Sequence, residues 1–242
     1  MRIGAFSDVH SNLEALKAVT DFLAQNGAQI LLCGGDIVGY GPDPEACIEL
    51  LQSLRVKVVA GNHDWGVAGR TPINQFNRLA AAALHWTRKN LKPAHRLFLK
   101  NLPLTFGLGP IHLVHAAPSA PEQWDYIFTL EEAVAEMGSF TAEICLIGHS
   151  HLPLFVEQLS GKQAREITES PFPLLPDGKY LISLGSVGQP RDGDPRACCV
   201  LIDLNEHLVS FYRLPYCITA TQKKIRAFGL PEPLAERLAF GR

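Results

Sequence analysis

The apolar residues in the first third of the chain fall into short runs that alternate with amphipathic stretches. These runs predict three buried strands, at residues 2–6, 29–33 and 56–60. A capping box at Ser11-Asn12-Leu13-Glu14 opens a helix that Gly27 ends, and Asp43 and Pro44 begin a second helix as its N-cap and first-turn residue. This order predicts parallel strands with right-handed crossovers, so functional groups should collect beyond the carboxyl ends of the strands.

The pattern changes after the middle of the chain. One or two helices are expected between residues 72 and 101, broken by Pro93 and ended by Pro103, and a later helix runs from the capping box at Thr129 to Gly138. Strands are expected at residues 111–114 and 143–147. Further short strands, separated by Pro and Gly turns, predict a second, largely antiparallel sheet from residues 154–158, 163–167, 180–184, 197–203 and 209–214. Two helices finish the chain, and because no repeat or linker interrupts it, we expect a single domain over residues 1–242.

The composition narrows the class of protein. Of the 242 residues 47% are hydrophobic, which suffices for one well-buried core. The 22 Lys and Arg residues nearly balance 24 Asp and Glu residues, so a nucleic-acid partner is not favoured. The first residues are too short an apolar stretch for a signal peptide, and no stretch reaches membrane-spanning length. Six cysteines without Cys-x-x-Cys spacing, several of them in apolar runs, indicate a reduced cytoplasmic protein with buried thiols.

Basic residues are concentrated near the C-terminus. Six of them stand against Glu232 and Glu236, namely Arg213, Lys223, Lys224, Arg226, Arg237 and Arg242. Solvated helix faces account for such a segment. The alternative is a surface for an anionic substrate or for a second subunit, so a homo-oligomer stays open.

Five short motifs stand at the ends of predicted strands and carry most of the functional information. They are Asp8-Val9-His10, Gly35-Asp36, Gly61-Asn62-His63-Asp64, His115 and Gly148-His149-Ser150-His151. Together they offer three oxygen ligands and four imidazoles, with one more histidine among them. That inventory is typical of a hydrolytic centre in which a shared carboxylate bridges two cations.

The spacing within the motifs supports convergence on metal ions. Residues two apart in an extended segment point the same way, so Asp8 and His10 can reach one cation, and His149 and His151 repeat this arrangement. The glycines before Asp36 allow a tight turn that brings its carboxylate inward, where its two oxygens can bridge two cations. A histidine at a strand end or an Asp in a turn is ordinary when taken singly, but five such motifs in order favour a metal centre.

Other reactive side chains are expected to lie outside this centre. Structural or surface roles are expected for His85, His95, His112 and His207. Ser150 lacks the turn of a nucleophile elbow, and Cys198 and Cys199 fall in a predicted core strand.

The five motifs resemble those of the calcineurin-like metallophosphoesterase superfamily over residues 3–155. The resemblance implies an α/β fold, a four-layer α/β/β/α sandwich of two mixed sheets flanked by helices, with a dinuclear centre at the strand ends. It implies that the first metal is bound by Asp8, His10, Asp36 and His151, and the second by Asp36, Asn62, His115 and His149. By the same resemblance His63 is the catalytic histidine, which points at the leaving group.

The stretch Gly185-Ser186-Val187-Gly188-Gln189-Pro190-Arg191 is similar to the small bacterial and archaeal branch of this family, where such a turn lies near the active site. Members of that branch are described as phosphodiesterases, dinucleoside-polyphosphate hydrolases or protein phosphatases. Arg191 is the candidate for binding a substrate phosphate, and the alternative is a solvated turn arginine.

The chain departs from the Ser/Thr protein phosphatases of the family. Those enzymes carry Gly-Asp-x-x-Asp-Arg-Gly, in which the second Asp orients the catalytic histidine and the Arg binds phosphate. Here Gly39 and Tyr40 stand at these two positions, which disfavours protein phosphatase activity, and Asp64 or a backbone carbonyl is expected to orient His63 instead. His115 is followed by Ala116 where the family often has Gly. A non-catalytic scaffold, as in a retromer subunit with this fold, is disfavoured because every ligand type is intact.

The expected function is metal-dependent hydrolysis of small phosphorylated substrates by a phosphodiesterase or phosphatase. Two divalent cations about 3.5–4 Å apart would hold a bridging hydroxide that attacks phosphorus in line, and His63 would protonate the departing oxygen. Manganese is the first candidate because the family commonly uses it, and Fe, Co, Ni and Zn also suit a mixed set of His, carboxylate and amide ligands.

Overall fold

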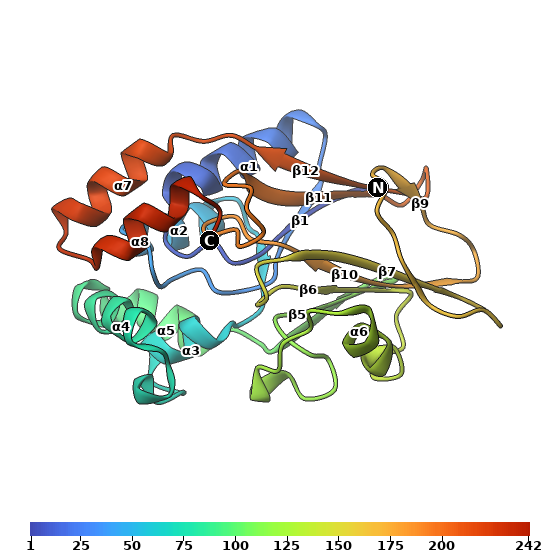
Figure 1. Cartoon of the computed structure of the whole chain (residues 1–242), viewed down its shortest axis with the longest axis horizontal. Helices are drawn as coiled ribbons and strands as arrows, with labels where there is room; N and C mark the ends of the chain where they lie inside the picture. The colour runs from blue at the N-terminus through green and yellow to red at the C-terminus, as the bar shows by residue number, and fades with distance from the viewer.

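Two six-stranded sheets stack face to face in the computed structural model, which describes residues 1–242 (Figure 1). The strand order of the first sheet is β3 (Lys57–Val58), β2 (Ile30–Cys33), β1 (Arg2–Phe6), β11 (Ala197–Asp203), β12 (Leu208–Leu214) and β9 (Phe172–Pro173). Strands β1, β2 and β3 are parallel, whereas β11, β12 and β9 pair antiparallel with their neighbours. The predicted parallel strands of the first third are therefore confirmed.

The second sheet is mixed as well. Its order is β4 (Thr105–Leu108), β5 (Ile111–Val114), β6 (Ile144–Ile147), β10 (Gly178–Leu184), β7 (Pro153–Leu159) and β8 (Arg165–Glu166). Strands β5, β6 and β10 are parallel, and β4, β7 and β8 add antiparallel pairs at the two sides. The prediction that the later strands form a sheet of their own is wrong, because β11 and β12 join the first sheet and β10 pairs with β6. An apolar run predicts burial of a strand but not which distant strand it pairs with.

Helices lie on both outer faces of the paired sheets and at one end of the sandwich. They are α1 (Leu13–Gln25), α2 (Pro44–Ser53), α3 (Asn62–Ala68), α4 (Arg78–Asn90), α5 (Pro93–Lys100), α6 (Leu130–Glu136), α7 (Ile218–Ala227) and α8 (Glu232–Glu236). Short 3₁₀ turns lie at η1 (Ile73–Gln75), η2 (Pro121–Gln123) and η3 (Arg237–Ala239). The break at Pro93 and the capping box at Thr129 are confirmed, whereas α3, β4 and β9 were not predicted. Figure 1 shows α1 above the first sheet and α6 below the second, which gives the four layers expected from the family resemblance.

The starts of the first two helices differ in detail from the prediction. The N-cap of α1 is Asn12, whose side-chain oxygen accepts the N–H of Ala15 at 3.2 Å, whereas the hydroxyl of Ser11 is buried without a partner. Asp43 precedes α2 as predicted, but its carboxylate makes no capping hydrogen bond because it binds Nζ of Lys224 at 2.8 Å. Tertiary contacts therefore decide the role of a side chain that the local pattern assigns to a cap.

The core follows the alternation of side chains along the strands. In β11, Val200 and Ile202 lie between the two sheets, whereas Cys199 and Leu201 belong to the cluster beneath α1 and α2. Both faces of this strand are thus buried, which explains its continuous apolar sequence. All six cysteines are free and only Cys217 is exposed, so the predicted buried thiols are confirmed for the other five.

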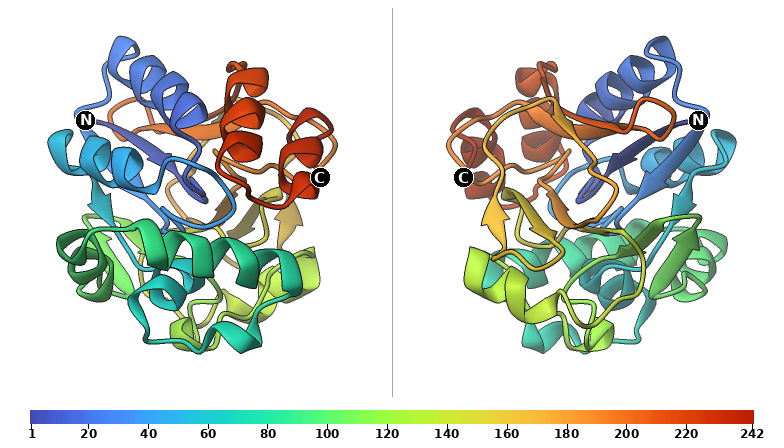
Figure 2. Two further views of the ribbon diagram at one scale, coloured as in Figure 1. Left: turned by 90° about the vertical axis from the view of Figure 1, so that its left-hand side faces the viewer. Right: turned by 90° about the vertical axis from the view of Figure 1, so that its right-hand side faces the viewer.

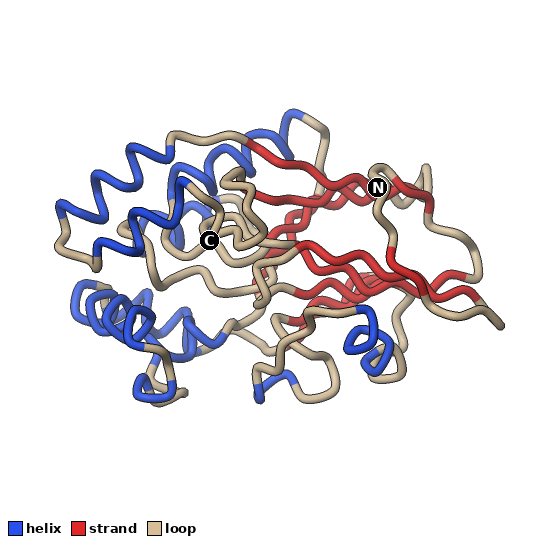
Figure 3. The backbone as a smooth tube through the Cα atoms, in the orientation of Figure 1, coloured by secondary structure: helices blue, strands red, loops and turns tan.

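The carboxyl ends of β1, β2, β5 and β6 lie toward one end of the sandwich, on the left in Figure 1. The left panel of Figure 2 shows this end, with α4 crossing one side and α7 and α8 on the other. Figure 3 shows that loops and turns fill the space between the strand ends and these helices. Most motif residues stand in those loops, whereas Asn62, His63 and Asp64 form the first turn of α3. No helix in the structure combines the length and the apolar character that a membrane crossing demands.

Candidate metal centre

The side chains of the predicted metal ligands converge at this end of the sandwich. The ligand atoms of Asp8, His10 and His151 form one group, and those of Asp36, His115 and His149 form another. Within each group the atoms lie within 4.8 Å of one another, and every one of these residues is buried. The structure therefore brings together residues that lie up to 143 positions apart in the sequence, from Asp8 to His151, as the motif pattern predicted.

In the first group, two imidazoles face each other through their Nε2 atoms. Nδ1 of His10 lies 3.1 Å from the carbonyl oxygen of Val38, and Nδ1 of His151 lies 2.6 Å from that of Gln189. Since a carbonyl oxygen only accepts, both Nδ1 atoms carry the proton and both neutral rings present a lone pair at Nε2. These Nε2 atoms are 3.0 Å apart, and Oδ1 of Asp8 is 3.2 Å from that of His151.

The second group has the same construction. Nδ1 of His115 donates to the carbonyl oxygen of Gly34 at 2.6 Å, so the neutral ring presents its lone pair at Nε2. This Nε2 lies 3.2 Å from Nδ1 of His149 and 3.5 Å from Oδ2 of Asp36. A backbone carbonyl that fixes the tautomer and the orientation of a ring is the usual support of a metal-binding histidine.

Asp36 lies between the two groups. Its Oδ2 is 3.7 Å from Nε2 of His10 in the first group and 3.5 Å from Nε2 of His115 in the second. Its Oδ1 accepts the backbone N–H of His63 at 2.8 Å, which fixes the carboxylate. A β-carbon at Gly61 would stand 2.1 Å from this Oδ1, so the glycine of the Gly-Asn-His-Asp motif leaves the room that Asp36 occupies.

Asn62 begins α3 and lines a cavity of about 220 Å³ together with His149. Its Oδ1 is buried and has no hydrogen-bond partner. Phe76, Trp124 and Tyr126 also line this cavity, which therefore offers an apolar wall beside the second group.

The donor set fits two divalent cations. Among the predicted metal ligands, three buried side-chain atoms lack any hydrogen-bond partner in the protein, namely Oδ1 of Asp8, Oδ1 of Asn62 and Nε2 of His149. Buried polar atoms are rarely left unpaired, and facing lone pairs repel each other unless a proton or a cation lies between them. Carboxylate, amide and imidazole ligands together suit Mn, Fe, Co, Ni and Zn.

The backbone reaches this arrangement by a route that the sequence pattern did not predict. Asp8 and His10 have φ angles of 55° and 47°, and His149 and His151 have φ angles of 68° and 61°. The expectation that each pair lies in an extended segment is therefore wrong, because all four residues adopt the left-handed region. Such conformations in non-glycine residues cost about 1–3 kcal/mol each and occur mainly at functional sites.

His63 lies beside the first group, in a cage of aromatic rings. Its ring centroid is 4.6 Å from that of Tyr40, 4.8 Å from that of His10 and 5.2 Å from that of Phe76. A nitrogen of His63 is also within 4.8 Å of the ligand atoms of His10 and Asp36, so both a ligand and a proton donor role are within its reach.

No side-chain partner orients the imidazole of His63. Its Nδ1 is buried without a hydrogen bond and faces Gly39, where a β-carbon would stand only 2.3 Å away. The prediction that Asp64 or a backbone carbonyl orients this ring is wrong for both alternatives at Nδ1. Oδ1 of Asp64 accepts the backbone N–H groups of Ile37 and Val38, Oδ2 accepts that of Gly61, and no carbonyl oxygen accepts from Nδ1 of His63. Asp64 instead ties the loop after β2 to the start of α3.

Burial dominates the protonation of the histidines in the metal-free protein. It lowers the pKa of His63 to about 4 and that of His149 to about 3, and it also lowers the pKa values of His10 and His151. At His115 burial acts in the same direction, but the neighbouring Asp36 carboxylate outweighs it and raises the pKa to about 9. Neutral imidazoles are the form that binds a metal ion.

Arg191 lies next to this centre, as predicted for a substrate-binding residue. Its Nη2 is 3.4 Å from the hydroxyl of Tyr40 and 3.2 Å from Oε1 of Gln189. The turn before it is attached to the first ligand, since the hydroxyl of Ser186 and the N–H of Gly188 both donate to the carbonyl oxygen of Asp8 at 2.9 Å. The sequence pattern missed Tyr40, because a tyrosine in a glycine-rich loop carries no local signal.

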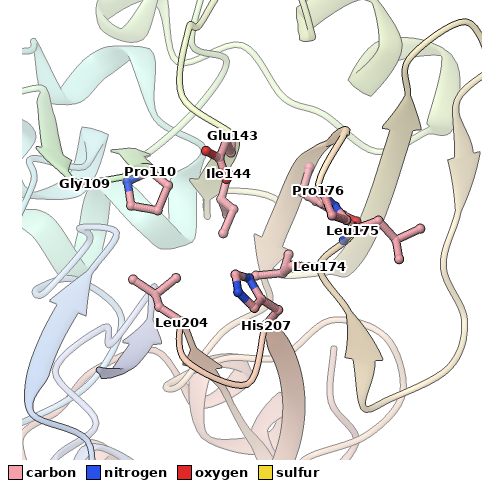
Figure 4. Close-up of a pocket in the computed structure, with 10 residues that line it drawn as sticks. Gly109, Pro110, Glu143, Ile144, Leu174, Leu175, Pro176, Leu204 and His207 are labelled. Atoms are coloured by element: carbon pink, nitrogen blue, oxygen red, sulfur yellow. The ribbon is translucent and has the colours of Figure 1, made fainter.

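The remaining histidines lie outside the centre, as expected. His95 on α5 contacts Glu45 and Glu49 at 3.6 and 3.5 Å, an arrangement that the neighbouring Lys92 shares. His207 lines a large cavity of about 760 Å³ with Pro110, Ile144 and Leu204 (Figure 4). This cavity lies at the starts of β5 and β6, the end of the sandwich opposite the motifs, so it is separate from the metal centre.

The sequence and the fold are similar to those of known proteins. Residues 1–207 match the model of the calcineurin-like phosphoesterase superfamily domain. An uncharacterized protein of Methanocaldococcus jannaschii is 39% identical over 99% of this chain and 98% of its own length. The crystal structure of a metallophosphoesterase from Sphaerobacter thermophilus is 39% identical, with a TM-score of 0.86 over 100% of this chain and 99% of that one. A hypothetical protein from Pyrococcus horikoshii OT3 shares the fold, with 22% identity and a TM-score of 0.82 over 100% of this chain and 98% of its own.

Proposed function

Because the chain belongs to the calcineurin-like phosphoesterase superfamily, we propose that its metal centre binds two divalent cations and hydrolyses small phosphoesters. The observation that carries the proposal is the position of Asp36, whose Oδ2 lies within 3.7 Å of an imidazole nitrogen of each ligand group. One carboxylate between two sets of ligands is the construction of a two-metal hydrolytic site.

The residues divide into two ligand sets. Asp8, His10 and His151 would hold one cation together with Asp36. Asn62, His115 and His149 would hold the other, again with Asp36. When bound, the cations neutralise the charge of the phosphoryl oxygens and make hydroxide available as a nucleophile at neutral pH.

The protein itself supplies the proton and holds the substrate. His63 would donate a proton to the departing oxygen once the negative charge of the bound phosphoester opposes the burial that lowers its pKa in the free protein. Its ring is held for this by the cage of His10, Tyr40 and Phe76 rather than by a carboxylate. Arg191 would bind a phosphoryl oxygen, and the cavity beside Asn62 would receive the organic part of the ester. We also propose that residues 1–242 act as one domain, since the C-terminal helices pack against Tyr40 at this site.

The first test measures metal dependence and substrate class. Chelator-treated protein is reloaded with Mn²⁺, or with Fe, Co, Ni or Zn, and is assayed on phosphomonoesters, phosphodiesters, dinucleoside polyphosphates and phosphopeptides. We expect no activity without metal and, with metal, hydrolysis of small esters in preference to phosphopeptides. Equal activity in the chelated protein, or no hydrolysis of any ester when two ions are bound, would contradict the proposal.

The second test separates a proton donor from a metal ligand at His63. A general acid contributes roughly 10²–10⁴-fold, and its contribution is largest when the leaving group is poor. His63→Ala should therefore lose most of this rate enhancement with alkyl esters and far less of it with p-nitrophenyl esters. Its metal content should equal that of wild type. His112→Ala, on β5 and outside the centre, is the control. A rate ratio that does not change with the leaving group, together with lost metal, would identify His63 as a ligand.

A further inference from the structure

Two arginines from distant parts of the chain meet at one uncharged side chain. Nη2 of Arg191 and Nη1 of Arg237 lie 3.2 and 3.1 Å from the same atom, Oε1 of Gln189. Both arginines are half-buried, and Gln189 is buried. Arg191 follows β10 in the turn after Gly185, whereas Arg237 begins η3 near the C-terminus.

Neither guanidinium group has a carboxylate within 4.0 Å. Three cations of the basic C-terminal segment do have such a partner: Arg213 binds Asp192, Arg226 binds Glu232, and Lys224 binds Glu14 and Asp43. Lys223 and Arg242 have none, but both are exposed to water. Arg191 and Arg237 therefore differ from the other basic residues of this region in being half-buried without a counter-charge.

Such an arrangement is unfavourable without an anion. Two half-buried positive groups held together repel each other, and a single amide oxygen cannot satisfy their donors. Nε of Arg191 is buried and has no partner at all. Burial and the positive charge of Arg191 lower the pKa of Arg237, as expected for two cations that repel each other. Planar guanidinium groups bind phosphate oxygens with two parallel hydrogen bonds, so a phosphate would complete the site.

The arginine pair is attached directly to the metal centre. The backbone carbonyl of Gln189 accepts from Nδ1 of His151 at 2.6 Å, while its side chain holds both guanidinium groups. The hydroxyl of Tyr40 lies 3.4 Å from Nη2 of Arg191, and its ring lies 4.6 Å from the rings of His10 and His63. A phosphate held by the pair would thus lie one aromatic ring away from the candidate catalytic histidine.

Arg237 comes from outside the part of the chain that matches the family model, which ends at residue 207. The segment that carries it is packed onto the site, since Leu234 and Leu238 form one buried cluster with Tyr40 and with Ala80 and Ala83 of α4. The C-terminal helices therefore hold Arg237 in place beside Arg191.

We propose that Arg191 and Arg237 form a clamp for a phosphate group of the substrate. The clamp rests on the proposed function for the choice of phosphate over other anions. The phosphate is either the one that is cleaved or a second phosphate on the same substrate, and both present the same oxygens to the two guanidinium groups.

The direct test is a calorimetric titration of the metal-loaded protein with inorganic phosphate. Arg237→Gln should weaken phosphate binding by roughly 10–100-fold, which is the contribution expected of hydrogen bonds from one charged group. Arg237→Lys keeps the charge and should weaken phosphate binding less. Arg242→Gln removes the same charge from an exposed residue whose guanidinium lies 5.8 Å from the ring centroid of Phe240, and should bind like wild type. Binding by Arg237→Gln that equals wild type would overturn the clamp.

Gln189→Glu provides a second test that does not depend on removing an arginine. The variant has nearly the same shape and places a carboxylate between the two guanidinium groups. It should raise the melting temperature, because the cations gain the missing counter-charge, and should weaken phosphate binding at least tenfold. Unchanged phosphate affinity in Gln189→Glu would also overturn the clamp.

Kinetics then identify which phosphate is bound. If the clamp holds the cleaved phosphate, Arg237→Gln raises KM for every substrate. If it holds a second phosphate, KM rises only for substrates with two, such as a nucleoside bisphosphate compared with a nucleoside monophosphate. The phosphate titration needs no turnover, so a chain without hydrolase activity would refute the proposed function and still leave the clamp testable.

Discussion

Gly39→Ala should disable His63, the candidate catalytic histidine, without removing any candidate metal ligand. Gly39 has a φ angle of 96°, and a β-carbon there would stand 2.3 Å from Nδ1, 3.1 Å from Cγ and 3.3 Å from Cε1 of His63. The added methyl group therefore collides with one side of the imidazole. The ring cannot simply tilt away, because Tyr40, His10 and Phe76 enclose it.

The size of the effect follows from these distances. Ordinary contact to a β-carbon begins at 3.4 Å, so the ring must move by about 1 Å. A displacement of about 1 Å in a positioned catalytic group costs roughly 10²-fold in rate. The left-handed backbone adds about 1–2 kcal/mol of strain for any residue with a β-carbon. We therefore expect a folded, less stable protein with kcat lowered about 100-fold on alkyl esters.

The assay compares kcat and metal content across leaving groups. Gly107→Ala is the matched control, because a β-carbon at this position of β4 meets no atom within 4 Å. It should keep its activity. The double variant Gly39→Ala/His63→Ala should be no slower than His63→Ala alone, since the methyl group acts through the ring that is gone. A wild-type rate in Gly39→Ala, or rate losses that multiply in the double variant, would refute this account of His63.

Three further predictions concern metal content, pH and folding. Asp36→Ala should bind fewer metal ions than wild type and lose activity, because the variant lacks the carboxylate that lies between the two ligand groups. Elemental analysis that finds two tightly held ions in an active variant would contradict the bridging role of Asp36. In the metal-free folded protein the pKa values of His63 and His149 are about 4 and 3, below the value of about 6.5 in the unfolded chain. The unfolded state therefore binds more protons, and the free energy of unfolding should fall by about 2 kcal/mol per histidine as the pH drops from 7.5 to 5. His115 and Asp64, whose raised pKa values of about 9 and about 8 give the opposite sign, are together outweighed by the four histidines with lowered values. Urea midpoints that do not change with pH would contradict the prediction. Asn12→Ala should destabilise the fold by about 2 kcal/mol, whereas Asn77→Ala, at the exposed N-cap of α4, should cost about 1 kcal/mol. The difference arises because the side chain of Asn12 also forms hydrogen bonds with Gly188, Thr221 and Tyr216. Equal urea midpoints for the two variants would contradict this prediction.

The elements that the sequence predicted well are those with a local signal. The strand at residues 2–6 and the one at 197–203 have the predicted bounds, and the capping box at Thr129 starts α6. The start of α3 at Asn62 was not predicted, because Gly61 makes no side-chain cap and the helix is supported by Asp64 through contacts with the distant loop after β2.

The candidate ligands could be predicted because they follow strands whose carboxyl ends must meet. Their backbone could not, since left-handed conformations at Asp8 and His151 depend on contacts with Gly35, His149 and the turn at Gln189. The aromatic contacts that hold His63 could not be predicted from the sequence around it either, because they come from Tyr40 and Phe76, which are far apart in the sequence. Arg237 lies 48 residues from Gln189, and only the packing of the C-terminal helices brings it to the site.

The most direct test of the two-metal centre is anomalous diffraction from crystals of the Mn²⁺-loaded protein, recorded at the manganese edge. The account predicts two peaks with Asp36 between them, one beside Asp8, His10 and His151 and the other beside Asn62, His115 and His149. A single peak at saturating metal, or peaks away from these side chains, would contradict it.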